Sequence, residues 1–407
     1  MKISGIITEY NPFHLGHKLH LEKSKTLSNS DAIVCVMSGN FMQRGIPAIL
    51  NKWNRASIAL ANGVDLIIEL PTVFSISSAE FFSKGAISIL NSLGVVDSIC
   101  FGSESGSIKN LSLISEILVN EPALFKEKLS EILSSGIPYH KARSLALKNF
   151  IENNNLDFDE DIESFLNSSN NILGIEYIKS LLILKSNIKP LSFMREGSNY
   201  NDKNLTGNFS SATSIRESYF KNKSLDNLKD SLPIKTFSIL KNFLENGENF
   251  TDPEIMFKYI KHSLITNKEV LLKIPDVNEG IDNKILKEIP KCNSLEEFIL
   301  CVKSKRYTYT RINRILCNIF LGTYSYNLLE LRNTSPKYVR ILGLNEKGAK
   351  ILKKVKKYSD IEIITKIPND LTNPMIKLDI QATNCYSLIS NKTRYNEDYL
   401  RSPIIYK

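Results

Sequence analysis

The chain has 407 residues, 42% of them hydrophobic and 23% charged, which is ordinary for a globular protein and predicts two or three domains. No apolar run reaches the roughly 18 residues that span a bilayer. The N-terminus does not resemble a signal peptide, so we expect a cytoplasmic protein with no membrane association. The six cysteines are scattered without a CxxC pair, which argues against a zinc ribbon and a disulfide framework.

The formal net charge is +9, and it is unevenly distributed along the chain. Residues 1–260 carry 26 lysine and arginine residues against 28 aspartate and glutamate residues. Residues 261–407 carry 26 against 15. This asymmetry indicates a polyanionic partner that contacts the C-terminal part. The alternative is a solvated, lysine-rich surface with no such partner.

Apolar, β-branched segments alternate with helical patterns through the first hundred residues. Strands are predicted over Ile3–Ile7, Ala32–Met37, Leu66–Leu70 and Asp97–Phe101, helices over Leu15–Leu27, Lys52–Asn62 and Ala79–Leu93, and a further edge strand over Ile188–Phe193. The alternation predicts right-handed βαβ units and an α/β fold with a Rossmann-like parallel sheet. Ligand contacts gather at the strand ends of such a sheet.

After the fourth predicted strand the pattern becomes mainly helical. Residues 107–185 are mostly helical, and from about residue 230 the alternation fades. Only short strands are expected there, near Ile361–Ile364. We therefore expect an α/β unit over residues 1–230, followed by a basic, mainly helical unit over residues 231–407.

The sequence His14-Leu15-Gly16-His17 lies between the first predicted strand and the first predicted helix. Gly16 has no Cβ, so a phosphate can approach the backbone, and the free N–H groups of a helix start favour an anion. The two imidazoles can donate hydrogen bonds to phosphate oxygens as charge develops. Two other interpretations stay open. Together with His20 the histidines have a spacing compatible with zinc, or they are structural.

This arrangement resembles the HxGH motif of the nucleotidyltransferase superfamily, whose members attack the α-phosphate of ATP and release pyrophosphate. The short motif is weak alone, and its context between a strand and a helix strengthens it. The longer string from Thr8 to His17 resembles the start of the bacterial tRNA(Met) cytidine acetate ligases. That resemblance extends through most of the chain.

Three further segments resemble motifs of the same family. Ser210–Arg216 is similar to the S-S-T-x-I-R motif that closes over the phosphates, although Ala212 interrupts the triplet; an ordinary helix cap is the alternative. Ser38–Gly45 is similar to the loop beside the active site, in which Arg44 can neutralise negative charge. Ser169–Tyr177 is similar to the Asn-Asn-x-Leu-Gly segment, whose amides can bind an adenine edge.

The resemblance implies roles for individual residues of this chain. It implies catalytic roles for His14, His17, Lys18 and Arg44. It implies an ATP site formed by Ile7, Thr8, Glu9, Tyr10, Asn11, Pro12, Phe13, Leu15, Gly16, Leu19, His20, Gly102, Asn170, Asn171, Arg195, Ser211, Thr213 and Arg216.

A basic segment with interleaved tyrosines, Lys303–Arg314, lies in the C-terminal part. Its composition suits phosphate contact and base stacking, and it resembles the family's R-[FY]-T-x-x-R-[IL]-x-R segment. The alternative is a solvated amphipathic helix. The tRNA-binding positions expected here and nearby are Lys305, Arg306, Tyr307, Arg311, Arg314, Lys337 and Arg340.

The reaction that the resemblance implies uses ATP, acetate and elongator tRNA(Met). Acetate forms acetyl-adenylate and pyrophosphate, and the wobble cytidine then accepts the acetyl group to give N4-acetylcytidine. Mg²⁺ is expected with the triphosphate, but no acidic pair marks its ligands, and no protein-bound metal is expected. Two alternatives remain: a nucleotidyltransferase for a small cofactor precursor, which would not need the basic part, and a non-catalytic RNA-binding protein.

Overall fold

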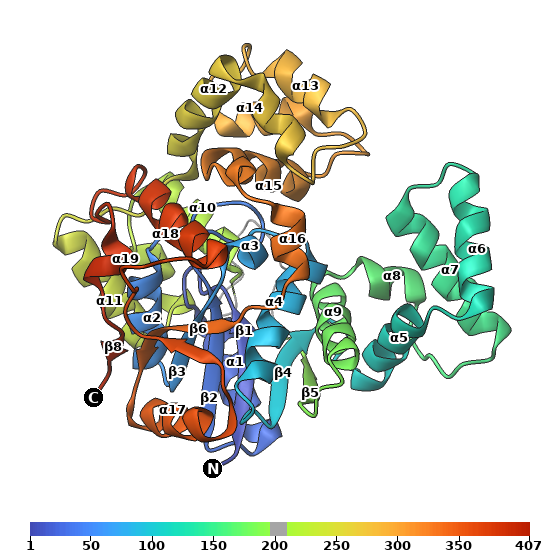
Figure 1. Ribbon diagram of the computed structural model, residues 1–407, viewed down its shortest axis with the longest axis horizontal. Coiled ribbons are helices and arrows are strands. Elements are labelled where there is room, and N and C mark those ends of the chain that lie inside the picture. The colour runs from blue at the N-terminus through green and yellow to red at the C-terminus, as the bar shows by residue number, and fades with distance from the viewer. Residues whose placement is uncertain (196–209) are drawn as a thin grey trace.

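A computed structural model describes residues 1–195 and 210–407. The described strands form one sheet in the order β5-β4-β1-β2-β3-β6-β7, with β8 beside β6 (Figure 1). Their bounds are β1 Ile3–Thr8, β2 Ala32–Ser38, β3 Leu66–Leu70, β4 Ser98–Ser103, β5 Lys189–Met194, β6 Tyr338–Leu344, β7 Glu362–Ile364 and β8 Ile404–Ile405.

The predicted α/β fold with a Rossmann-like parallel sheet is confirmed. Strand β1 pairs in parallel with β2 and β4, β2 with β3, and β4 with β5. All residues of β2 and β3 are buried, as expected for strands covered on both faces. The first helices are α1 Leu15–Ser28, α2 Lys52–Ala61, α3 Thr72–Ser75 and α4 Ala79–Ser92.

A group of helices is inserted between β4 and β5. It comprises α5 Ile108–Asn120, α6 Ala123–Ser134, α7 Tyr139–Asn153, α8 Ile162–Asn167 and α9 Ser169–Ile183. Helices α5 and α9 pack against the body of the molecule, whereas α6 and α7 project to one side of it (Figure 1). This insertion is the mostly helical stretch that the sequence predicts.

The C-terminal part is built largely of helices. These are α10 Ala212–Asn222, α11 Ile234–Glu245, α12 Met256–Thr266, α13 Ile281–Glu288, α14 Leu295–Val302, α15 Tyr309–Phe320, α16 Leu328–Asn333, α17 Glu346–Tyr358, α18 Pro374–Ser387 and α19 Glu397–Leu400. Helices α12 to α15 supply much of a hydrophobic core to which Phe41, Ile76 and Tyr386 also contribute, and they form the top of the molecule in Figure 1.

Strand β6 corrects one expectation from the sequence. It runs antiparallel to β3, with Glu69 opposite Arg340, although strands were expected only near residues 361–364. Arg340 made this segment resemble a basic surface, but Asp398 compensates its charge in the interior at 3.5 Å. The sheet therefore extends across the predicted boundary between residues 1–230 and 231–407, and that division stays a prediction.

A buried ionic cluster fastens the C-terminal segment to the sheet. Lys52 at the start of α2 lies 2.7 Å from Glu69 of β3 and 2.8 Å from Asp398 of α19, and Arg340 adjoins Asp398. All four side chains are at most 3% exposed. Such charges are costly to bury unless every partner is present, so the cluster ties α2, β3, β6 and α19 together.

Within residues 1–195 and 210–407, no helix has the length and apolarity needed to cross a membrane.

Candidate active site

The turn between β1 and α1 presents two histidines at a helix start. His14 is the N-cap of α1 and its Nδ1 accepts a hydrogen bond from Gly16 N at 3.1 Å. His17 Nδ1 accepts one from His14 N at 3.3 Å, which completes a reciprocal capping box. Since Nδ1 is the acceptor in both rings, each neutral imidazole carries its proton on Nε2.

Burial keeps these imidazoles neutral. It lowers the pKa of His14 to about 3, with further lowering by Arg195 and Arg216. Burial also holds the pKa of His17 well below its usual value, and the neighbouring His14 adds to this. The two rings are 3.8 Å apart between centroids. At neutral pH both rings are therefore uncharged, and each can donate one hydrogen bond.

These histidines open into a cleft at the strand ends of the sheet. The predicted site residues that line it are Ile7, Thr8, Glu9, Tyr10, Asn11, His14, His17, His20, Arg44, Gly102, Asn170, Arg195, Ser211 and Arg216. They come from the ends of β1, β4 and β5, from α1, α9 and α10, and from the loop that follows β2. The cleft thus lies where parallel-sheet folds bind ligands.

The loop after β2 is held over the cleft by the side chains of Glu9 and Arg55. Glu9 Oε1 accepts a hydrogen bond from Gln43 N at 2.6 Å. Burial raises the pKa of the Glu9 carboxyl, although Gln43 and nearby arginines oppose this. Arg55 of α2 donates to the carbonyls of Glu9 (2.7 Å), Leu50 (3.1 Å), Ser38 (3.1 Å) and Gly39. These bonds fix the segment that carries Arg44.

Helix α10 delivers an arginine to the same cleft. Ser211 caps the helix by accepting a hydrogen bond from Ser214 N at 3.1 Å. Arg216 donates from Nη1 to the Asn11 carbonyl at 2.7 Å and from Nη2 to Thr213 Oγ1 at 3.2 Å. Thr213 therefore holds Arg216 and does not itself line the cleft.

The opposite wall is formed by β4, β5 and α9. A Cβ on Gly102 would lie 2.9 Å from Arg195 Cγ. A glycine at this position therefore leaves room for the Arg195 side chain. Asn170 Nδ2 donates to Glu104 at 2.7 Å and lines the cleft. Asn171 is 1% exposed and bonds Ser105 N and the Phe165 carbonyl. It braces β4 against α9 and does not reach the cleft.

Several predicted residues lie behind the cleft lining. Lys18 is half-exposed and pairs with Glu22 at 4.0 Å. Gly16 packs against the His14 ring, because its Cβ would lie 2.9 Å from His14 Cε1. The predicted residues that do not line the cleft are Pro12, Phe13, Leu15, Gly16, Lys18, Leu19, Asn171 and Thr213.

Other lining residues carried no assignment from the sequence. They are Met42, Gln43, Ile46, Phe82, Phe101, Leu173, Tyr177 and Ala212. Most are apolar, and in the sequence such residues on a helix or strand have the pattern of core positions. Five of them lie inside the three motif-like segments Ser38–Gly45, Ser169–Tyr177 and Ser210–Arg216, and that position is the signal that could have identified them: Met42, Gln43, Leu173, Tyr177 and Ala212.

The basic segment around α15 lies next to the loop that carries Arg44. A Cβ on Gly45 would clash with Arg314 N, so the two backbones touch. Tyr307 donates to the Glu279 carbonyl at 2.6 Å, and Arg311 pairs with the Glu279 carboxylate at 2.9 Å. Lys305 and Arg306 precede them and are exposed.

The remaining two predicted RNA contacts lie on β6 or just before it. Lys337 is exposed. Arg340 is 3% exposed, donates to the Asp398 carbonyl at 3.2 Å and pairs with its carboxylate. The Arg340 side chain is therefore too deeply buried to contact a polyanion.

Metal binding finds no support in the described parts of the chain. Within residues 1–195 and 210–407, no group of three or more His, Cys, Asp or Glu side chains has an arrangement that could hold a metal ion. His20 is engaged elsewhere, because its Nε2 bonds the Cys100 carbonyl at 3.0 Å. The described residues therefore do not support zinc binding by the three histidines.

Comparisons with known proteins found similarity over the length of the chain. A family model described as HIGH nucleotidyl transferase matches residues 1–399. The chain is 52% identical over 409 residues to a tRNA(Met) cytidine acetate ligase of Clostridium perfringens (strain SM101 / Type A), with 100% of both chains covered. It is 50% identical over 407 residues to the Clostridium botulinum (strain Okra / Type B1) protein of that name, covering 100% and 99%.

Solved structures extend the likeness to three dimensions. Apo TmcAL of Thermotoga maritima matches with a TM-score of 0.93 at 34% identity. The same protein bound with alpha-thio ATP matches with a TM-score of 0.90 at 34% identity. Each comparison covers 100% of this chain and 99% of the other.

Proposed function

Because this chain belongs to the HIGH nucleotidyltransferase family and, within it, to the family of the tRNA(Met) cytidine acetate ligases, we propose that it joins acetate to the wobble cytidine of elongator tRNA(Met) at the expense of ATP. The observation that carries this proposal is the pair of neutral imidazoles, His14 and His17, at the start of α1 in a cleft that also holds Arg195 and Arg216.

The first step activates the carboxylate. An acetate oxygen attacks the α-phosphorus of ATP, the bond to the β-phosphate oxygen breaks, and pyrophosphate leaves with that electron pair. The Nε2–H groups of His14 and His17 are suited to donate to the α-phosphate oxygens as negative charge accumulates. Arg195 and Arg216 are suited to the triphosphate, since a guanidinium binds phosphate through two parallel hydrogen bonds.

The second step transfers the acetyl group. The N4 amine of cytidine attacks the carbonyl carbon of acetyl-adenylate, the bond to the AMP oxygen breaks, and the amine loses a proton. Arg44, on the loop fixed by Glu9 and Arg55, is suited to hold the adenylate while the base enters. The cytidine has to leave its stack to react, so the tRNA needs contacts outside the cleft, and Lys305, Arg306 and Arg314 are the candidates.

Magnesium stays an expectation. Among the described residues that line the cleft, Glu9 supplies the sole carboxylate, and its Oε1 already accepts a hydrogen bond from Gln43 N. Mg²⁺ in nucleotide sites is held by phosphate oxygens, water and one or two carboxylates. The described residues do not form such a ligand set on their own, and no step above depends on the ion.

ATP–pyrophosphate exchange tests the proposal. Purified protein is given ATP, labelled pyrophosphate and either acetate, formate, propionate or no acid, each with and without bulk tRNA. We expect exchange that depends on acetate. Exchange with none of the acids, under either tRNA condition, would contradict the proposal. Retained tRNA binding would then favour a non-catalytic RNA-binding protein, and its loss a nucleotidyltransferase for a small molecule.

A further inference from the structure

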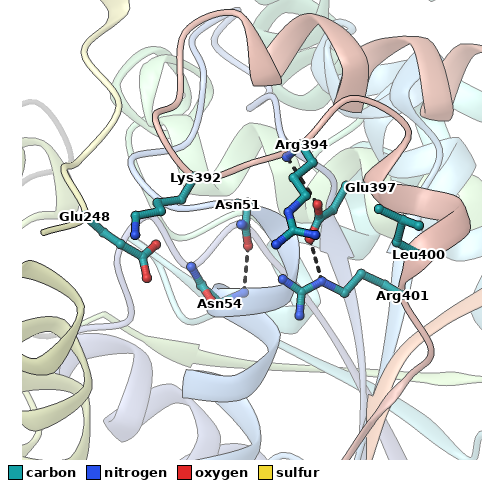
Figure 2. Close-up of a pocket in the computed structure, with 8 residues that line it drawn as sticks. All are labelled: Asn51, Asn54, Glu248, Lys392, Arg394, Glu397, Leu400 and Arg401. Carbon is teal, nitrogen blue, oxygen red and sulfur yellow. Dashed lines mark hydrogen bonds and ion pairs between the residues drawn. The ribbon is translucent and has the colours of Figure 1, made fainter. Parts of the chain in front are cut away.

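A polar pocket of about 420 Å³ lies outside the cleft, between α2 and the C-terminal segment. Figure 2 shows its lining side chains pointing into a shared space from both elements. The residues that line it are Asn51, Asn54, Glu248, Lys392, Arg394, Glu397, Leu400 and Arg401. None of them has a part in the reaction described above.

In the C-terminal segment the acidic side chains that follow are buried, whereas the basic side chains are exposed. Glu397 and Asp398 are at most 3% exposed. Glu397 accepts hydrogen bonds from Arg394 N at 3.1 Å and Arg401 Nε at 2.6 Å, and Asp398 belongs to the buried ionic cluster. The cationic side chains of Lys392, Arg394 and Arg401 face outward. Glu397 and Asp398 are therefore already used, and Lys392, Arg394 and Arg401 outnumber the one further carboxylate of the lining, Glu248.

Three side chains that line this pocket can donate hydrogen bonds that no described residue accepts. Within residues 1–195 and 210–407, no hydrogen bond or ion pair engages the side chains of Asn54 or Lys392 or the guanidinium of Arg394. Figure 2 shows the guanidinium groups of Arg394 and Arg401 turned toward one another. Glu397 already pairs with Arg401 at 2.6 Å, so Arg394 is the guanidinium that stays available to an added anion. Guanidinium forks fit phosphate oxygens in pairs.

Two exposed tyrosines lie among these cations in the sequence. Tyr395 is 70% exposed and Tyr399 is 43% exposed. Both stand in the same stretch of chain as Arg394 and Arg401. Arginines that bind phosphates, beside aromatic faces on which bases stack, are the usual composition of a surface that binds unpaired RNA. An acidic peptide would use the arginines but would leave the tyrosines without a role.

One loop of the chain contributes residues to both the pocket and the cleft. Asn51 at its end lines the pocket, and Met42, Gln43, Arg44 and Ile46 line the cleft. Within that loop, Ile49 N donates to Asn11 Oδ1 at 2.9 Å, and Asn11 itself lines the cleft. A ligand that occupies both places would extend along one loop.

We propose that this pocket binds a backbone phosphate of the RNA substrate, with Tyr395 and Tyr399 against adjacent bases. The proposal rests on the RNA substrate of the proposed function. It adds a second contact region to the basic segment around α15, on a different part of the molecule.

Binding of tRNA at several salt concentrations tests this proposal. The double variant K392Q/R394Q removes two exposed cations that hold no partner among the described residues, so the fold is expected to persist. We expect the Kd for tRNA to rise about tenfold or more and the salt dependence to weaken by about one unit of slope for each lost phosphate contact. Y395A is expected to weaken binding about fivefold or more through lost stacking.

The matched control is K126Q/K148Q, which removes two exposed lysines from the projecting helices α6 and α7. It is expected to leave tRNA binding unchanged. Acetate-dependent exchange should be unchanged in every variant, so a failure of the proposed function appears in the wild-type exchange and not in these binding data. Unchanged tRNA affinity and salt slope in K392Q/R394Q would overturn the proposal. So would loss of polyglutamate or inorganic phosphate binding while tRNA affinity is kept.

Discussion

The backbone of Gly45 lies against the backbone of Arg314, at a φ of +74° and so close that a Cβ would clash with Arg314 N. This contact joins the loop that carries Arg44 to the basic segment at the start of α15. The rim of the cleft and the expected RNA-binding region therefore share one interface. A change at this contact is therefore expected to displace both the loop that carries Arg44 and the basic segment at the start of α15.

The variant G45A is expected to displace this loop and to lower acetate-dependent exchange about tenfold or more. The matched control is G247A, because Gly247 has the same φ of +74° and a Cβ there would meet nothing within 4 Å. Both substitutions carry the backbone strain of alanine at positive φ, on the order of 1 kcal/mol. Equal exchange rates in the two variants would show that the contact with Arg314 does not position the loop.

The two histidines are expected to act before the RNA enters the reaction. H14A and H17A should each lower the exchange rate by roughly 10²- to 10³-fold, as loss of a preorganised donor does. Binding of tRNA should remain within about twofold, since the loss concerns the α-phosphate. The control is H262A, which changes an exposed histidine of α12. Exchange that survives both cleft substitutions would contradict the assigned role.

The buried histidines also predict how stability depends on pH. Burial lowers the pKa of His20 to about 4, against the raising effect of its hydrogen bond to Cys100. Between pH 6.5 and 4 the unfolded chain binds a proton that the folded protein does not, so the free energy of unfolding falls as pH falls through this window. The contribution is at most about 1.4 kcal/mol per pH unit.

Urea denaturation across this range, without ATP, measures that slope. H20Q is expected to have a shallower slope than the wild type between pH 6.5 and 4, and the two should be parallel above pH 7. H262Q should follow the wild type throughout. A wild-type slope retained in H20Q would mean that the folded protein accommodates the protonated His20.

The N-terminal fold and many residues that line the cleft can be predicted from the sequence, because their signals are local. The strand Ile3–Thr8, the turn, and the histidine that caps α1 are consecutive in the chain. The strand, the turn and the helix cap are each compatible with a parallel sheet. Such agreement between local signals makes a prediction of the fold reliable. Arg195 and Arg216 have similarly local signals, because Arg195 directly follows the end of β5 and Arg216 lies five residues after the helix cap Ser211.

The features that the sequence did not predict depend on contacts between segments that are far apart in the chain. Strand β6 pairs with β3 across most of the chain, and Arg340 is tolerated there only because Asp398 returns to neutralise it. Similarly, Phe82 and Leu173 reach the cleft from helices whose apolar faces otherwise build the core. No local pattern distinguishes an apolar cleft residue from a core residue.

The buried ionic cluster predicts a large effect of a single charge on stability. K52M leaves Glu69 and Asp398 without their shared cation, and it is expected to lower the free energy of unfolding by about 3–5 kcal/mol. The matched control is K350M, because Lys350 pairs with Glu346 at the same 2.7 Å but with 64% and 84% of the two side chains exposed. That loss should be about 0.5 kcal/mol or less. Similar losses in the two variants would contradict the role assigned to the cluster.

Transfer of labelled acetate to tRNA tests the central claim most directly. The purified protein is incubated with ATP, radiolabelled acetate and elongator tRNA(Met), and the tRNA is digested to nucleosides. We predict label in N4-acetylcytidine alone, with one AMP formed per acetyl group, and none with a tRNA whose wobble base is not cytidine. Labelled acetyl-adenylate without label in the tRNA, or label in another nucleoside, would contradict the claim.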